Sequence, residues 1–593
     1  MAVSCKRLLL LAACIRGTYL VGTLLLSHYI ADYDTSASLL SESCEDGWPE
    51  AIAEVLQQRP WVVWDSVFSH RIAACGYEYE QFFAFFPGFS GLVWLLRSTG
   101  LFAGINGFAV ASLVLNNCLF LLSVVLLAKL SDAFLQDDKL SATAVLVFML
   151  SPASIHNCMA YTEALFTAAS WLGLYCLYCR GSSSTAALAF TLSSAARSNG
   201  LLNAGFLLHE YGKRFLKAWP HSKAHALWQA LQGVISAAVT AAPYFGYMMF
   251  GYSQFCAGVY AEQQRPWCSK VLPSVYGYVQ DVYWNVGLLR YYEWNQIPNF
   301  LLALPTLIMS LWGALAYACA NPHLLLTGGL LTQQQLERWF SSSSARSRCN
   351  AQPGPPNNAQ AGLKQGGCSS SCSGSGTCSN SRPCSYLAPV IVGYVQYVCS
   401  CGGSAQEGGP CAGAATASGA LEVPVKQPPE IPGVAYQPLR QRQLEVSSTK
   451  QQLDAPSERQ QQRQCYRKPL AEEGTTGTQL RQRRPATARG TASAVHAALL
   501  QEHWSCSCSS RRAYYSPGVA VFVVHWLLLT LVCLAVVHIQ VATRLLSSCV
   551  PLYWFAALLM VHKGGVLRWL LWWYCFAFMG VGAVFFTNFY PWT

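Results

Sequence analysis

Long apolar stretches, separated by short polar ones, repeat along most of the chain. The first follows Lys6 and Arg7 and runs for about 20 mostly apolar residues, which is long enough to cross a bilayer as a helix. With this one included, the pattern predicts about nine or ten membrane segments, and hence an all-α polytopic membrane protein. The further stretches lie near 101–129, 141–155, 162–179, 183–209, 227–250, 298–320, 518–541, 548–562 and 566–587.

Charges beside the first stretch predict its orientation. Lys6 and Arg7 favour a cytosolic N-terminus under the positive-inside rule, so residues from about 28 to 86 would lie on the far side. A cleaved signal peptide is the competing interpretation. It is disfavoured because Arg16 interrupts the apolar run and no clean small-x-small site follows. We therefore expect a retained first span.

The stretch 183–209 does not fit a single crossing. Arg180 before it and the cluster Lys213, Arg214 and Lys217 after it both favour the cytosolic side. The stretch also contains "AARSNG", and an arginine at membrane depth is tolerated only beside a cavity or in a broken helix. We expect 183–209 to dip in and return, or to run as two short helices.

A polar insertion at 328–512 divides the chain into an N-terminal membrane region (1–327) and a C-terminal one (513–593). The insertion is rich in Ser, Gln, Gly and Pro, which predicts disorder, and its charge favours the cytosolic side. It holds 11 of the 25 cysteines at irregular spacings, unlike those of a zinc site. The cysteine pattern does not decide between an oxidising and a reducing compartment.

Composition agrees with a membrane protein, since 53% of residues are hydrophobic and only 11% charged. The net charge of +11 is typical of proteins that bind nucleic acid, but the distribution of this charge argues against such a function. The insertion alone carries 19 Lys plus Arg against 10 Asp plus Glu, so the membrane regions are close to neutral.

Four polar stretches stand among the apolar ones. They read "WDSVFSHRIAACGYEYEQFFAFFPG" (64–88), "SPASIHNCMAYTEAL" (151–165), a tyrosine- and tryptophan-rich loop (266–299) and "HIQVATRLLSS" (538–548). On this topology 64–88, 266–299 and 538–548 share one face, with the first two in the lumenal loops near 28–86 and 251–297. An interfacial aromatic belt explains many of the rings but not the carboxylates. Rings beside acids are typical of a site for a sugar or lipid-linked substrate. A transport pathway and merely structural polarity remain open.

These stretches resemble a known family. Trp-Asp, Gly-Tyr-x-Tyr-Glu and Ala-Phe-Phe-Pro-Gly in 64–88, with "SPASIHNCMAYTEALF", "RSNGLLNAGF", "YGYVQDVYWNVGLLRYYEWNQIPNF", "HIQVATRLLSSCVPLYWF" and the terminal "NFYPWT", are similar to the motifs of the GPI mannosyltransferase 2 family, in the same order. Thr162 stands where the family has serine. Only the insertion falls outside the resemblance.

The resemblance implies a GT-C glycosyltransferase of the endoplasmic reticulum membrane. Such an enzyme adds the second mannose, in α-1,6 linkage, to the one-mannose GPI precursor. It takes the sugar from dolichyl-phosphate-mannose on the lumenal face and inverts the anomeric centre. Another dolichol-dependent mannosyltransferase, a lipid or sugar transporter and a non-catalytic subunit are the alternatives.

An inverting transfer needs a carboxylate base and a cation at the leaving phosphate. By the resemblance, Asp65 is the base and Glu80 the second choice, or a binder of acceptor hydroxyls. The structural alternative for Asp65 is helix N-capping. For Arg197 it is a pairing with Glu163 or with a backbone carbonyl. The residues expected to bind substrate are Arg544 and Arg197 (lipid phosphate), Gln280, Asp281 and Asn285 (acceptor glycan), Trp64 and Glu163.

No metal and no cofactor are expected, because a monophosphate donor has no diphosphate for a divalent ion to clamp. The expected partners are the lipid-linked donor, the GPI-precursor acceptor and the endoplasmic reticulum membrane. A small membrane subunit is implied by the family in some lineages, and no nucleic acid is expected.

Overall fold

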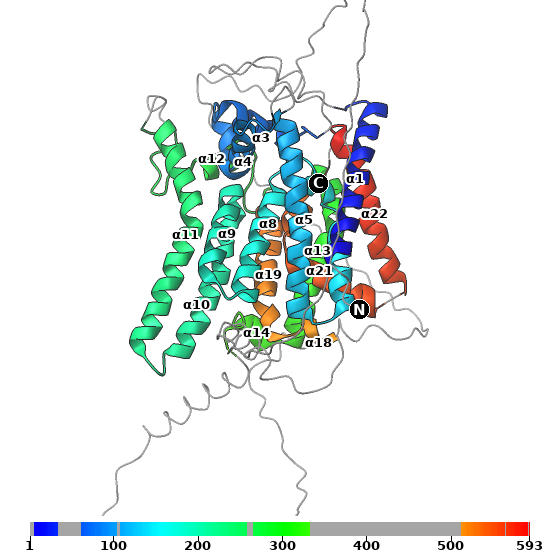
Figure 1. The fold of residues 1–593 in the computed structure, drawn as a ribbon. Helices are drawn as coiled ribbons and strands as arrows, with labels where there is room; N and C mark the ends of the chain where they lie inside the picture. Colours follow the sequence, from blue (N-terminus) through cyan, green and yellow to red (C-terminus); the bar gives the residue numbers. More distant parts are fainter. Residues whose placement is uncertain are drawn as a thin grey trace, which may run out of the picture. The chain divides into compact units, whose positions relative to one another are not determined.

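A computed structural model describes residues 5–33, 61–102, 107–257, 265–331, 511–563, 565–590 and 592. All of them belong to one compact unit, formed by residues 1–373 and 489–593. A second unit, 374–488, lies outside the described residues, as do the insertion's predicted disorder and cytosolic location. The regular structure in the described part is helical, without a strand, as the sequence predicts (Figure 1).

Six described helices are long and apolar enough to cross a membrane, which confirms a polytopic membrane protein. A seventh span is added if residues 539–546 and 550–562, bent by 82°, count as one. The six are α1 (Cys5–Tyr29), α5 (Gly107–Leu135), α11 (Lys223–Phe255), α13 (Ile297–Ala320), α19 (Ala520–Ala535) and α22 (Gly565–Thr587).

The remaining apolar stretches form shorter helices, which is why nine or ten segments give six or seven candidate spans. Helices α6 (Asp138–Met149) and α8 (Glu163–Leu174) have 12 residues each. At about 1.5 Å per residue each is roughly 18 Å long, against about 30 Å of hydrocarbon. Both are mostly buried, so their apolar residues face protein.

Residues on both sides of the insertion build one core. Helix α6 packs against α5 and against α21 (Val550–His562), and α13 packs against α19. Indole groups join the two regions, because Trp171 Nε1 donates to the Ser548 carbonyl at 2.7 Å and Trp554 Nε1 to Ser131 Oγ at 2.8 Å.

The chain reverses inside 183–209, which confirms both forms of the prediction. Helix α9 (Ser183–Ala196) ends at Arg197, a 3₁₀ turn η4 (Ser198–Asn203) folds back against it, and α10 (Ala204–Ala218) follows. Asn203 Nδ2 donates to Ser193 Oγ at 2.9 Å. Lys213 Nζ lies 5.9 Å from the Tyr178 ring centroid, so the basic cluster returns close to Arg180.

Helix α1 packs against α5 and α22. Its arginine, Arg16, is buried where it interrupts the apolar run. The Arg16 Nη1 donates to the Ser154 carbonyl at 2.8 Å and its Cζ lies 3.5 Å from the Phe120 ring centroid. The Tyr19 hydroxyl donates to the Met579 carbonyl at 2.9 Å. The charged residue therefore joins α1 to the rest of the unit.

Short elements carry the polar stretches. In Figure 1, α3 (Asp65–Cys75), α4 (Pro87–Ser98) and α12 (Val275–Val282) lie at the same end of α5, α8 and α9. Contacts agree, since α4 packs against α3, α5 and α9, and α12 against α11. The other short elements are η2 (Glu80–Ala84), α7 (Ser154–Cys158), the π-helical η3 (Tyr175–Cys179), η6 (Trp294–Gln296), α14 (Pro322–Leu326), α18 (Arg511–Tyr514), η7 (Pro517–Val519), η8 (Ile539–Val541) and α20 (Ala542–Leu546).

Candidate active site

Four of the nine predicted site residues form one ion-paired cluster. Arg544 Nη2 donates to Asp65 Oδ2 at 2.7 Å, and Arg544 Nε donates to Glu163 Oε1 at 2.8 Å. Arg197 Nη1 pairs with the same Glu163 oxygen and donates to Thr162 Oγ1 at 3.0 Å. These residues come from α3, α8, α20 and the end of α9. The fold therefore brings together two carboxylates and two guanidinium groups that are far apart in the sequence.

Glu163 is the buried centre of this cluster. Its side chain is only 3% exposed, and both arginines bind its Oε1. Because it is the first residue of α8, its negative charge also lies at the positive end of the helix dipole. With two cations paired to it, Glu163 is suited to orient Arg197 and Arg544. The structural alternative for Arg197, a pairing with Glu163, is thus observed.

Asp65 is the open carboxylate of the cluster. Its side chain is 35% exposed, against 3% for Glu163. N-capping does not account for it, because Trp64 occupies the cap position of α3 without a side-chain cap bond, and Asp65 is the first helical residue. Its carboxylate binds Arg544 instead. Asp65 is therefore the solvent-accessible acid of this cluster.

Both arginines keep donors for an anion. Arg544 uses Nε and Nη2, and its Nη1 has no hydrogen-bond partner among the described residues. Among the described residues, Arg197 donates hydrogen bonds through Nη1 only. Their side chains are 13% and 18% exposed. A guanidinium fork with unused donors matches the oxygens of a phosphate.

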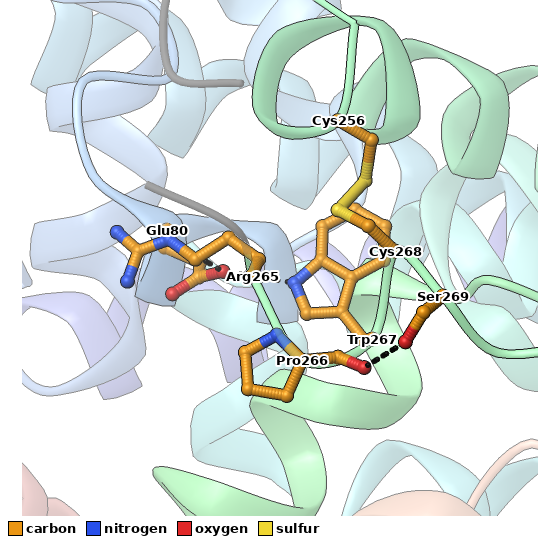
Figure 2. Close-up of a disulfide and its surroundings, with 7 residues drawn as sticks. All are labelled: Glu80, Cys256, Arg265, Pro266, Trp267, Cys268 and Ser269. Carbon is orange, nitrogen blue, oxygen red and sulfur yellow. Dashed lines mark hydrogen bonds and ion pairs between the residues drawn. A yellow bond between two sulfur atoms is a disulfide. The ribbon is translucent and has the colours of Figure 1, made fainter. Parts of the chain in front are cut away.

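Glu80, the second candidate base, lies in a separate network (Figure 2). Trp267 Nε1 donates to its Oε1 and the Tyr283 hydroxyl to its Oε2, each at 3.0 Å, and Arg265 Nε lies 3.7 Å from Oε1. Burial and the neighbouring Glu80 carboxylate raise the pKa of Tyr283 to about 12. Glu80 is buried and both its oxygens accept hydrogen bonds, so it joins loops that are 187 or more residues apart in sequence.

A disulfide stabilises the same network. Cys256, just after α11, is bonded to Cys268, the neighbour of Trp267 (Figure 2). Cys75, at the end of α3, is also disulfide-bonded. Disulfides persist in oxidising compartments. The two disulfide-bonded loops therefore favour an oxidising environment, which the sequence alone did not indicate.

The predicted acceptor residues lie at and after the end of α12. Gln280 is one turn after Tyr276, whose hydroxyl lies 2.8 Å from Ser198 Oγ, next to Arg197. Asp281 pairs with Arg290 at the surface. Asn285 is exposed, with a left-handed φ of 50°. Gln280 therefore shares a helix face with a residue that contacts the arginine side of the cluster, whereas Asp281 has a partner in its own loop.

Aromatic rings connect the α12 loop to α3. Phe68, one turn after Asp65, lies 6.2 Å from Trp284 and stacks on Phe85 at 4.8 Å between ring centroids. Trp64 packs 6.1 Å from Phe589, near the C-terminal end of the described chain, and its buried Nε1 has no partner among the described residues. The ion-paired cluster and the loops of the Glu80 network therefore both lie beside helix α3.

The motif around Glu163 contains a further contact residue that the sequence did not single out. Tyr161 accepts a hydrogen bond from the Asp65 amide at 3.2 Å, and its ring centroid lies 5.1 Å from Arg544 Cζ. The only signal was its position two residues before Glu163. Within the described ranges, no group of three or more His, Cys, Asp or Glu side chains is placed to hold a metal ion; the expected lack of a metal requirement stays a prediction.

Comparisons with known proteins identify the family of the chain. The chain matches the family described as Mannosyltransferase (PIG-V) over residues 5–593. It is 35% identical over 305 residues to GPI alpha-1,6-mannosyltransferase 2 of Rattus norvegicus, covering 45% of this chain and 60% of that protein. It is 33% identical over 249 residues to GPI mannosyltransferase 2 of Yarrowia lipolytica, covering 42% and 64%.

The human GPI alpha-1,6-mannosyltransferase 2 is 35% identical over 300 residues, covering 45% of this chain and 59% of that protein. The alignments thus span about three fifths of these relatives. No solved structure matches the chain. Because the family match runs over nearly the whole length, the chain belongs to the PIG-V mannosyltransferase family.

Proposed function

We propose that this protein transfers the second mannose, in α-1,6 linkage, from dolichyl-phosphate-mannose to the one-mannose GPI-anchor precursor at the lumenal face of the endoplasmic reticulum membrane. The names of its relatives support a GPI acceptor and the α-1,6 linkage. The observation that carries the proposal is the cluster of Asp65, Glu163, Arg197 and Arg544. It combines an accessible carboxylate with two oriented guanidinium groups.

The reaction is a single displacement with inversion. An acceptor hydroxyl oxygen attacks the anomeric carbon, the bond from that carbon to the phosphate oxygen breaks, and its electron pair leaves with dolichyl phosphate. Asp65 takes the hydroxyl proton as this bond breaks. The transition state has oxocarbenium character, so the open carboxylate also lies where positive charge develops on the sugar.

Arg544 and Arg197 stabilise the negative charge that grows on the leaving phosphate. In the substrate-free protein, Arg544 is bound to Asp65. A phosphate at the unused Nη1 competes with Asp65 for this guanidinium. The buried Glu163 keeps both arginines oriented while the exchange takes place. Donor binding thus frees the Asp65 carboxylate for the acceptor hydroxyl.

The Glu80 network and the α12 loop shape the acceptor side. Gln280 and Asn285 supply neutral hydrogen-bonding groups for sugar hydroxyls, and Asp281 and Trp64 border the same end of the protein. Glu80 already accepts two hydrogen bonds from protein, which favours a role in orienting these loops over one in proton transfer.

Two features support a lumenal site. The disulfide between Cys256 and Cys268 needs an oxidising compartment, which the endoplasmic reticulum lumen provides. The chain reversal within 183–209 brings Lys213 and Arg180 together at the other ends of α8 and α9, where positive charge favours the cytosol.

The proposal is tested with purified full-length protein, synthetic dolichyl-phosphate-mannose and a one-mannose glucosaminyl-phosphatidylinositol. The expected product carries a second mannose that an α-1,6-specific mannosidase removes. Transfer to a different dolichol-linked or peptide acceptor, with none to the GPI precursor, would show another mannosyltransferase. Substrate movement across sealed vesicles without any product would show a transporter.

A further inference from the structure

Tyr161 is buried in the connection between α7 and α8, and its orientation is fixed from several sides. Asn116 Nδ2, from α5, donates to the Tyr161 carbonyl at 2.8 Å and also to the Met159 carbonyl. The rings of His156 and Phe586 lie 5.2 Å from the Tyr161 ring. The side chain is therefore a rigid group between three elements.

The Tyr161 hydroxyl bridges both sides of a strained residue. It accepts from the Asp65 amide at 3.2 Å and donates to the Val63 carbonyl at 3.3 Å. Between them Trp64 has φ 54° and ψ −125°, a backbone conformation that is costly for a residue with a Cβ. One phenol oxygen thus stabilises the turn that sets the direction of the first residue of α3.

The Tyr161 ring also faces the partner of Asp65. Arg544 Cζ lies 5.1 Å from the ring centroid, within cation–π distance. Tyr161 therefore contacts both members of the Asp65–Arg544 pair, one through its oxygen and the other through its ring.

We propose that Tyr161 is a positioning residue, which holds the start of α3, and with it Asp65, in place beside Arg544 for the transfer step. This inference rests on the proposed function and extends it to a side chain that does not touch the reacting atoms. Misplacement of a reacting group by about 1 Å can cost roughly 100-fold in rate. Tyr161→Phe removes the hydroxyl and keeps the ring, so kcat is expected to fall roughly 10- to 100-fold. Neither lipid KM changes much, because the hydroxyl contacts only protein.

Tyr317→Phe is a matched control. Tyr317 in α13 is also fully buried, and its hydroxyl donates to the Ser516 carbonyl at 2.9 Å. Both variants lose one buried hydroxyl, but only Tyr161→Phe changes the Trp64 turn. Full-length wild type and variants are compared in kcat and KM for both lipids. Amide hydrogen exchange is followed in peptides covering residues 61–70.

The expected result is a lower kcat and faster exchange in 61–70 for Tyr161→Phe alone. An unchanged kcat, an equal loss in Tyr317→Phe or a change confined to KM overturns the positioning role. If the wild-type protein transfers no mannose, the proposed function is wrong, and hydrogen exchange alone tests whether Tyr161 orders the start of α3. If exchange in 61–70 is also unchanged in Tyr161→Phe, the inference about Tyr161 is wrong as well.

Discussion

Replacing Glu163 tests how the buried centre of the cluster acts. Glu163→Gln removes the carboxylate that pairs with both Arg197 and Arg544, which are 18% and 13% exposed. Among the described residues, Asp65 then remains as a partner of Arg544. Removing one partner of a buried ion pair costs about 3–5 kcal/mol. We use the lower figure, about 3 kcal/mol, because Asp65 remains to compensate one of the two charges. At about 2 °C per kcal/mol, the melting temperature is expected to fall by about 6 °C.

Glu210→Gln is the control. Glu210 also pairs with two cations, Lys213 at 2.9 Å and Arg214 at 3.2 Å, but these are 40% and 34% exposed. Exposed pairs of this kind contribute about 0.2–1 kcal/mol each, so the loss of both pairs is expected to lower the melting temperature by about 4 °C or less. The assay is thermal unfolding of purified protein in one detergent, with mannose transfer measured in parallel. Equal shifts for the two variants, or a stable Glu163→Gln with full transfer, would refute the assigned role of Glu163.

Three further expectations concern the loops and the chemistry. Glu80→Gln keeps one of the two oxygens that accept hydrogen bonds from Trp267 and Tyr283 and loses the other. Thermal stability should therefore fall, and the KM for the GPI-precursor acceptor should rise by a larger factor than kcat falls. A kcat loss as large as that of Asp65→Asn would make Glu80 the base. After reduction, a membrane-impermeant maleimide should label Cys256 and Cys268 only in permeabilised microsomes; labelling in sealed ones contradicts a lumenal site. A chelator should leave transfer unchanged, and loss of transfer restored by Mn²⁺ would establish a metal requirement.

Hydropathy predicted the class of fold but not the number of spans. An apolar run does not tell whether its residues face lipid or protein, and α6 and α8 show the second case. The reversal within 183–209 was predictable because basic residues on both sides cannot be reconciled with one crossing. The positive-inside rule thus supplied information that apolar length did not.

The resemblance identified Asp65, Glu163, Arg197 and Arg544, but only coordinates show that they form one network. Their difference in exposure depends on packing, so the sequence could not tell the open acid from the buried one. Tyr161 was missed for a related reason. Its contact with the Asp65 amide depends on the backbone angles of Trp64, which no side-chain pattern encodes.

The most direct test of the account is the kcat of purified Asp65→Asn, measured with both lipid substrates at saturation. Loss of the general base predicts a fall of about 10²- to 10⁴-fold, with the protein still folded because the carboxylate is 35% exposed and Arg544 keeps Glu163. Asp132→Asn, at an exposed position near the end of α5, should retain wild-type transfer. A kcat for Asp65→Asn close to that of wild type would contradict the account.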